Sequence, residues 1–338
     1  MRTKYLIIGL GSIGARHVRN LVKLDKSATF EILRSSRKKN ARLEELQQEF
    51  PGKITVSFDL ARSARKKPDV CLICNPPALH VSTALSVIPF CKNILIEKPL
   101  SHNMTQVDKL ISAAQKQRAV IMVGYCLRFH PVVKKAKKIV DSGQLGKIMF
   151  LRAEVGSYLP AWRKGVDYTR NYSAKKELGG GVILDLSHEI DYCYWLAGAP
   201  REITCSAAKV SDLDIDTEDL AEILLTYNSG AHCSIHLDYL QREPIRTLKI
   251  LFTKGQLSAD LISKKIEITR VQKDLLKKEF LDLNREDSDD MYIAELQHFL
   301  ECIKRNKQPL ISLEEGKAVL GICMKAKQSA DLKKTVNL

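Results

Sequence analysis

The chain begins with a stretch that restricts its possible folds, YLIIGLGSIGARHV at residues 5–18. An apolar run leads into Gly9, Gly11 and Gly14, spaced G-x-G-x-x-G, and a helical pattern follows. The first glycine allows a tight turn, the second allows a pyrophosphate to approach the backbone, and the third lets the helix pack on the strand. We therefore predict a dinucleotide-binding turn, with Ser12 and Ile13 beside the phosphates. A strand-to-helix turn without a ligand is the alternative.

The first 123 residues alternate between short apolar runs and amphipathic segments. Runs such as KYLIIG, DVCLIC and NILIE are typical of strands, and segments such as 13–24 and 103–117 are typical of helices. This alternation predicts βαβ units and a parallel sheet with helices on both faces. We expect residues 1–123 to form a dinucleotide-binding Rossmann domain.

From residue 124 the pattern changes to longer alternating strands separated by turn signals such as NSG and KG. Such strands are typical of antiparallel hairpins. We expect a helix at 182–196 and two C-terminal helices near 289–305 and 313–332. Residues 124–338 should therefore form an α+β domain with a large, mostly antiparallel, open-faced sheet. Its C-terminal helix is a candidate for packing back on the first domain.

The formal net charge is +15, but the cations are scattered in short clusters such as RSSRKK and KKAKK. An anionic small molecule fits this pattern better than a nucleic acid does. The first apolar stretch stops at glycines, so we expect no signal peptide, and no apolar run in the sequence reaches membrane-spanning length. We expect a cytoplasmic protein that binds neither nucleic acid nor membrane.

Nine cysteines occur at irregular spacing, which favours buried reduced thiols. Cys71 and Cys74 form a C-x-x-C motif inside an expected strand, where residues three apart point to opposite faces. We expect no metal site.

The end of the expected second strand reads EILRSSRKK. An NAD site usually places an acidic residue there to bind the adenosine ribose. This chain instead has Arg34, Ser35 and Arg37, which can donate hydrogen bonds to a 2′-phosphate. We therefore favour NADP(H) over NAD(H). The alternative is that these arginines are only solvated and the protein accepts either cofactor.

Several further motifs carry a family resemblance. They are NPPALH at 75–80, ILIEKPLS at 94–101, GYCLRFHP at 124–131, SGQLGKI at 142–148 and GGGVILDLSHEIDYCYWLAG at 179–198. Together they resemble the Gfo/Idh/MocA family, the glucose–fructose oxidoreductase and inositol dehydrogenase type. The resemblance implies NAD(P)-dependent oxidation or reduction of a sugar, cyclitol or related substrate. It also implies a homodimer or homotetramer formed through the C-terminal sheet.

Lys98 stands at the carboxyl end of an expected parallel strand, where ligands bind in open α/β sheets. A lysine there can donate to a substrate oxygen and stabilise developing alkoxide charge. The family resemblance implies that Lys98 is catalytic and that Glu97 helps to bind the cofactor. Asn75 and His80 should lie near the nicotinamide.

His188 is the best candidate for a proton carrier, because histidine titrates near neutral pH. Asp185 and Asp191 lie three residues away on either side, which on one helix places all three on roughly one face. The family pattern D-x-G-x-H-x-x-D is one residue longer before the histidine. Asp185 therefore either orients His188 or has left the site, and Asp191 is a candidate substrate contact.

A long loop rich in aromatic and basic residues precedes that helix. Tyr158, Trp162, Arg163 and Tyr172 are candidate substrate contacts, because aromatic rings pack on sugars and arginines bind carboxylate or phosphate. A subunit-contact arm is the alternative. The loop resembles a subgroup linked to surface-polysaccharide and nonulosonic acid pathways, which implies an anionic or nucleotide-linked sugar.

Three hypotheses follow. The first is an NADP(H)-dependent sugar oxidoreductase, in which Lys98 polarises the reacting oxygen and His188 moves the proton. The second is a redox-neutral enzyme that oxidises and then re-reduces one substrate with a bound cofactor. The third is a non-catalytic, cofactor-sensing protein on the same fold.

Overall fold

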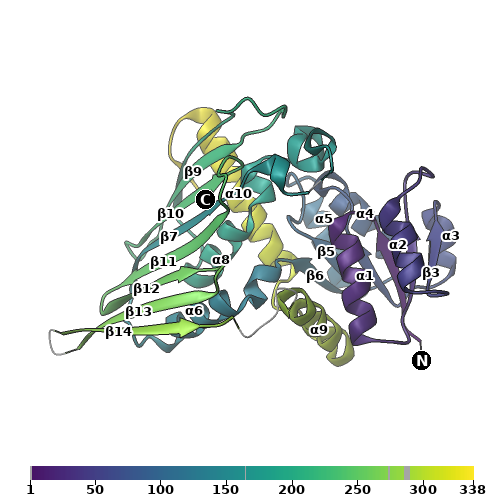
Figure 1. Ribbon diagram of the computed structural model, residues 1–338, viewed down its shortest axis with the longest axis horizontal. Coiled ribbons are helices and arrows are strands. Elements are labelled where there is room, and N and C mark those ends of the chain that lie inside the picture. Colours follow the sequence, from purple (N-terminus) through teal and green to yellow (C-terminus); the bar gives the residue numbers. More distant parts are fainter. Residues whose placement is uncertain (1, 164, 273–274, 285–289) are drawn as a thin grey trace. The chain divides into compact units, whose positions relative to one another are not determined.

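The computed structural model describes residues 2–163, 165–272, 275–284 and 290–338. Contacts divide the chain into two compact units (Figure 1). The first unit joins Met1–Tyr125 to Tyr292–Lys317, and the second joins Cys126–Met291 to Ala318–Leu338. A segment near the C-terminus therefore belongs to the first unit.

The first unit contains a parallel sheet of strand order β3-β2-β1-β4-β5-β6. Its strands are β1 Lys4–Ile8, β2 Thr29–Leu33, β3 Ile54–Ser57, β4 Val70–Ile73, β5 Asn93–Glu97 and β6 Val120–Gly124. The helices between them are α1 Ser12–Leu24, α2 Ala41–Glu49, α3 Leu60–Arg65, α4 His80–Val87 and α5 Val107–Gln117. The prediction of a Rossmann-type sheet is confirmed.

Strands β4 and β6 are buried along their whole length, and β5 is buried from Ile94 onward, as expected where helices cover both faces of the sheet. Helix α9 (Asp290–Arg305) contributes to the same unit, because the Arg16 guanidinium of α1 lies 4.5 Å from the centre of the Tyr292 ring. The expected first residue of this helix, 289, lies outside the described residues. The Val123 N–H of β6 donates to the Ile311 carbonyl at 3.0 Å, so the segment before α10 (Leu313–Leu332) lies beside the edge strand β6.

The second unit contains a nine-stranded sheet of order β14-β13-β12-β11-β7-β10-β9-β8-β15. All its neighbouring strands pair antiparallel except β7 and β10, which are parallel. The strands are β7 Ile148–Gly156, β8 Glu202–Ala208, β9 Leu220–Thr226, β10 His232–Asp238, β11 Ile245–Phe252, β12 Gly255–Asp260, β13 Lys265–Gln272, β14 Leu275–Asp282 and β15 Val336–Asn337. The prediction of a large, mostly antiparallel sheet is confirmed.

Helices α6 (Pro131–Ser142) and α8 (His188–Ala197) lie against one face of this sheet (Figure 1). The alternation along β9 follows that arrangement, because Ala221, Ile223 and Leu225 are buried whereas Glu222 and Leu224 are exposed. We refer to the face that bears Glu222 as the open face.

The expected helix over 182–196 is wrong as a single element. The chain forms a four-residue helix, α7 (Val182–Asp185), leaves helical geometry at Leu186, and begins α8 at His188. Asp185, His188 and Asp191 therefore do not share one face of a continuous helix. The Asp185 carboxylate at the end of α7 accepts hydrogen bonds from two residues outside the helix, Tyr172 and Tyr239.

The first residues of α10, up to Lys317, belong to the first unit, and Gly316 tests how they pack there, with Gly321 of the same helix as the control. A Cβ added at Gly316 would lie 2.6 Å from Val123 Cγ2, whereas no atom of the described chain lies within 4 Å of one added at Gly321. We expect Gly316→Ala to lower the free energy of unfolding by about 1–3 kcal/mol through overpacking. Gly321→Ala should raise it by up to about 1 kcal/mol through helix propensity. Chemical denaturation would measure both, and equal stability of the two variants would contradict this packing.

Candidate functional site

The glycine-rich turn between β1 and α1 is explained by close backbone approach. Gly9 has φ +93°, and a Cβ there would lie 2.7 Å from the Asn75 backbone nitrogen. A Cβ at Gly14 would lie 2.6 Å from the Gly9 carbonyl oxygen. Around Gly11, in contrast, no described atom lies within 4 Å of an added Cβ. The turn is therefore packed at its first and third glycines and open at its second.

The open side of this turn is the N-terminus of α1. The helix begins at Ser12 with Gly11 as its N-cap, has no side-chain cap, and carries no acidic residue in its first turn. Ser12 is exposed and Ile13 is partly exposed. The backbone N–H groups at this end and the positive end of the helix dipole suit a phosphate. These residues therefore fit the pyrophosphate of a dinucleotide.

The end of β2 lies beside the glycine turn, because the Gly9 N–H donates to the Leu33 carbonyl at 3.1 Å. Arg34 follows directly, and its guanidinium donates to the Lys38 carbonyl at 2.8 Å. Ser35 and Arg37 are exposed, and the Arg37 guanidinium lies 4.7 Å from the centre of the Phe58 ring. The nearest acid along the strand, Glu31, is 8% exposed and pairs with Lys66. The strand therefore ends in cationic and hydroxyl groups.

The expectation that His80 contacts the cofactor does not match its placement. His80 is 1% exposed, and its two ring nitrogens lie 2.8 Å from the Pro99 and Asn75 carbonyl oxygens. Burial lowers the pKa of His80 despite these two contacts. His80 therefore ties together the loops that follow β4 and β5. The Asn75 side chain donates to the Thr83 hydroxyl at 2.9 Å.

Glu97 and Lys98 close β5, at the edge of the sheet that also carries the glycine turn. Glu97 is 9% exposed, and its Oε1 lies 2.6 Å from His17 Nε2. Its Oε2 accepts the backbone N–H of Lys98 at 3.3 Å. Lys98 is partly exposed, and the bond from it to Pro99 is cis. The first unit therefore presents a lysine and a fixed carboxylate at the carboxyl end of one strand.

In the second unit, the Asp185 carboxylate accepts from two tyrosines. Tyr172 Oη donates to Oδ1 at 2.6 Å, and Tyr239 Oη donates to Oδ2 at 3.2 Å. Asp185 is 3% exposed, and burial and this carboxylate raise the pKa of Tyr239. His188 begins α8 three residues later. Sequence reasoning missed Tyr239, because nothing in its local pattern marks its partner 54 residues away.

The expectation that Asp191 contacts substrate does not match its placement either. Asp191 is fully buried, and both its oxygens lie within 3.1 Å of Arg128 Nε. Arg128 Nη2 donates to Oδ1 at 2.7 Å, and Arg128 is 1% exposed. This buried ion pair connects α8 to the segment that precedes α6.

The aromatic loop before α7 packs on the same region of the second unit. Trp162 donates from its indole nitrogen to the Ser157 hydroxyl at 2.7 Å and meets the Tyr239 ring edge-to-face at 5.3 Å. The Arg242 guanidinium lies 3.6 Å from the centre of the Tyr158 ring. Arg163 is partly exposed. Tyr172 and Trp162 are therefore brought together around Tyr239.

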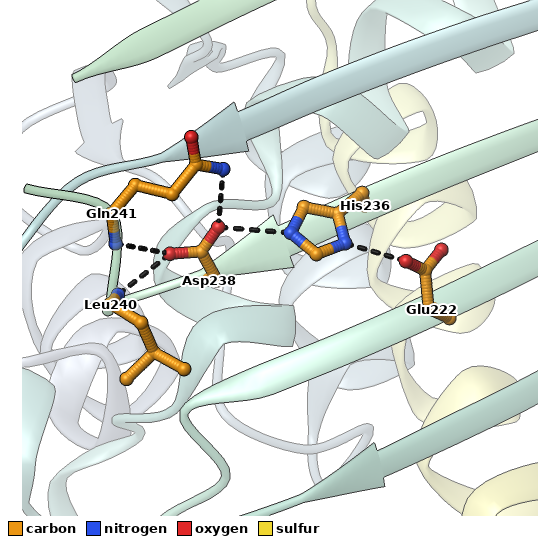
Figure 2. Close-up of polar contacts among 5 residues, drawn as sticks. All are labelled: Glu222, His236, Asp238, Leu240 and Gln241. Atoms are coloured by element: carbon orange, nitrogen blue, oxygen red, sulfur yellow. Dashed lines mark hydrogen bonds and ion pairs between the residues drawn. The ribbon is translucent and has the colours of Figure 1, made fainter. Parts of the chain in front are cut away.

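A charged triad of Glu222, His236 and Asp238 lies on the open face, at positions that no sequence motif marks (Figure 2). His236 Nδ1 lies 2.6 Å from Glu222 Oε1, and His236 Nε2 lies 2.9 Å from Asp238 Oδ2. A carboxylate only accepts, so both ring nitrogens carry protons and His236 is an imidazolium. Hydrogen bonding to Asp238, with a further contribution from Glu222, raises the pKa of His236 to about 9.

The triad also fixes the turn after β10. Asp238 Oδ1 accepts from the backbone N–H groups of Leu240 and Gln241, at 2.6 and 2.9 Å (Figure 2). The Gln241 side chain donates to the other oxygen at 2.7 Å. Tyr239, between these residues, points to the opposite face and reaches Asp185. Two successive residues at the end of β10 therefore make contacts on opposite faces of the sheet, Asp238 on the open face and Tyr239 on the other.

Two negative findings concern the described residues only. No group of three or more His, Cys, Asp or Glu side chains among them could hold a metal ion. No helix among them is long and apolar enough to cross a membrane.

Comparison with known proteins places both halves of the chain in one family. Residues 3–125 match the model described as oxidoreductase family, NAD-binding Rossmann fold, and residues 133–258 match the GFO/IDH/MocA C-terminal domain. The chain belongs to the Gfo/Idh/MocA family. The resemblance found from the motifs is confirmed, as is the expectation of a nicotinamide-dependent oxidoreductase.

Two relatives of this Gfo/Idh/MocA chain align over nearly its whole length. A myo-inositol 2-dehydrogenase from Thermotoga maritima is 26% identical over 98% of this chain and 97% of its own. A UDP-N-acetylglucosamine 3-dehydrogenase from Acidithiobacillus ferrooxidans is 23% identical over 96% of each. The structure of a levoglucosan dehydrogenase in complex with NADH superposes with a TM-score of 0.88 at 18% identity, covering 100% of this chain and 99% of the other. That likeness shows a shared fold.

The raised pKa of His236 predicts a pH dependence of stability. A group whose pKa is higher in the folded state stabilises the fold fully below its ordinary pKa, and this contribution is lost as the pH rises through the folded value. We expect the free energy of unfolding to fall by roughly 2 kcal/mol between pH 6.5 and about 9. Urea titrations across this range would measure it. His236→Gln should flatten the decline, and an unchanged slope in that variant would contradict the imidazolium assignment.

Proposed function

We propose that this chain is an NADP(H)-preferring oxidoreductase that moves a hydride between nicotinamide and a carbon of an anionic or nucleotide-linked sugar. The observation that supports this most strongly is the placement of Lys98. It lies at the carboxyl end of β5, at the same sheet edge as the open glycine turn. Ligands bind at that edge in open α/β sheets.

In the proposed reaction the bound nicotinamide supplies or accepts the hydride. The Lys98 ammonium donates to the oxygen on the reacting carbon and stabilises the charge that develops there. His188 accepts the hydroxyl proton during oxidation and returns it during reduction. Asp185, held by Tyr172 and Tyr239, supports the orientation of this catalytic segment.

The preference for NADP(H) rests on the end of β2. Arg34, Ser35 and Arg37 can donate hydrogen bonds to a 2′-phosphate, and the carboxylate of Glu31 is occupied by Lys66. A free acid at this strand end would instead favour the 2′-hydroxyl of NAD(H).

The substrate class rests on charge and on the aromatic loop. The relatives include dehydrogenases named for a cyclitol and a nucleotide-linked sugar. The net charge of +15 favours an anionic substrate. Tyr158, Trp162, Arg163 and Tyr172 supply aromatic faces and cationic donors to hold it. We also propose a cytoplasmic homodimer or homotetramer that assembles through the open-faced sheet.

The hydride-transfer proposal is tested by absorbance at 340 nm with NADP⁺ or NAD⁺ and a panel of neutral, acidic and nucleotide-linked sugars. We expect a rise with one class of sugar, and a loss of at least about 100-fold in Lys98→Met, because a donor to the developing charge is removed. NADPH binding should be retained. Lys92→Met, at the exposed amino end of the same strand, is the matched control and should leave turnover unchanged.

The redox-neutral and the cofactor-sensing hypotheses predict different outcomes in the same assay. Isomerised or dehydrated sugar without net absorbance change would identify the redox-neutral enzyme. Turnover that is present in wild type and disappears in Lys98→Met would exclude a pure sensor.

The cofactor preference is tested by titration with NADPH and NADH, followed by nicotinamide fluorescence. Arg34→Ala should weaken NADPH binding by about tenfold more than NADH binding, since a charge-assisted hydrogen bond is lost only with the 2′-phosphate. Lys26→Ala removes one positive charge at the amino end of β2 and should affect both cofactors little. An equal loss of affinity for NADPH and NADH in Arg34→Ala would contradict the assignment of Arg34 to the 2′-phosphate.

A further inference from the structure

A buried histidine in the middle of α1 lies against the candidate catalytic strand end. His17 is fully buried, and its Nε2 lies 2.6 Å from Glu97 Oε1. In the sheet, β4 separates β1 from β5. The helix that follows β1 therefore reaches across β4 to the residue before Lys98. One hydrogen bond connects the helix of the phosphate turn to the loop of the proposed catalytic lysine.

The Glu97 side chain is constrained from three directions. His17 donates to Oε1, and the Lys98 backbone N–H donates to Oε2 at 3.3 Å. On the third side, Gly124 of β6 is paired with Glu97, and a Cβ there would lie 3.3 Å from Oε2. The carboxylate thus has little freedom to rotate, and its position determines where the backbone of Lys98 is held.

A contribution to the stability of the fold does not explain why a histidine occupies this buried position. The carboxylate accepts from Nε2–H, so His17 Nδ1 remains buried with no hydrogen-bond partner among the described residues. An unsatisfied buried polar atom is costly, whereas two apolar side chains of the same shape in place of a buried polar pair can be neutral or stabilising. A role for His17 in keeping Glu97 in one position explains why a polar pair occupies this place.

We propose that His17 is a positioning residue for hydride transfer, holding the Glu97 carboxylate and through it the backbone of Lys98 in register with α1. This inference rests on the proposed function, since it assigns Lys98 to the reacting oxygen. The His17–Glu97 hydrogen bond holds α1, which would receive the phosphates, rigidly against the end of β5, which bears Lys98.

Three variants separate positioning from packing. His17→Leu removes the donor at similar volume, and His17→Gln retains an N–H donor. Asn20→Leu is the matched control, because Asn20 lies one turn further along α1, is 1% exposed, and has an amide nitrogen without a partner among the described residues. Each variant would be assayed for kcat, for NADPH affinity by fluorescence, and for the rate of Lys98 acetylation by acetic anhydride, read by mass spectrometry.

We expect His17→Leu to lower kcat by about tenfold or more, as small misplacements of catalytic groups do. NADPH affinity should change by less than about threefold. His17→Gln should recover most of kcat, and Asn20→Leu should leave it near wild type. In Glu97→Gln, adding His17→Leu should cause no further loss, because His17 acts through Glu97. Two results would overturn the proposal. One is a double variant in which the kcat losses of Glu97→Gln and His17→Leu multiply. The other is an equal loss of kcat in His17→Leu, His17→Gln and Asn20→Leu.

The acetylation rate keeps this inference distinct from the proposed function. If wild type turns over no sugar, hydride transfer fails, but the labelling comparison remains decisive. A Lys98 rate altered in His17→Leu and restored in His17→Gln would support the positioning role. The same Lys98 rate in all variants would overturn it.

Discussion

The close backbone approach at Gly9 and Gly14 is the constraint on which the first unit depends. With a Cβ at either position, the β1–α1 turn would collide with the Asn75 backbone or with its own carbonyl. Because both are glycine, α1 lies close against the sheet, its uncapped N-terminus stays open at Gly11, and His17 comes within 2.6 Å of Glu97. The geometry that suits a pyrophosphate therefore also sets the surroundings of Lys98.

Much of the fold could be predicted because its signals are local. Strand–helix alternation and the glycine spacing are read within about 15 residues, which is the range over which periodicity reports secondary structure. The site residues fall into two groups, those placed by a local motif and those placed by a distant partner. Gly9, Gly14 and Lys98 lie where their motifs place them, since each motif is a backbone feature of one turn or strand end.

The features that sequence reasoning missed are those decided by distant partners. Asp191 lies 63 residues from Arg128, and the sequence pattern H-x-x-D gives no sign that this carboxylate is buried in an ion pair. The local pattern over 182–196 predicts one helix, whereas the structure has two, α7 and α8, and the Asp185 carboxylate at the end of α7 binds Tyr172 from outside the helix. The triad around His236 arises from strand register, which brings Glu222 opposite His236 only once β9 and β10 pair.

The second unit uses glycine for the same physical purpose as the first. A Cβ at Gly180 would collide with the Tyr172 and Ser173 carbonyls, and one at Gly181, where φ is +97°, would collide with the Glu218 carboxylate. Glu218 is itself held by Lys327 at 2.9 Å. The loop that carries Tyr172 is thereby packed against the start of α7, close enough for the phenol to reach Asp185 at 2.6 Å. In both units, then, polar side chains acquire fixed partners because glycines let two backbone segments pack without an intervening Cβ.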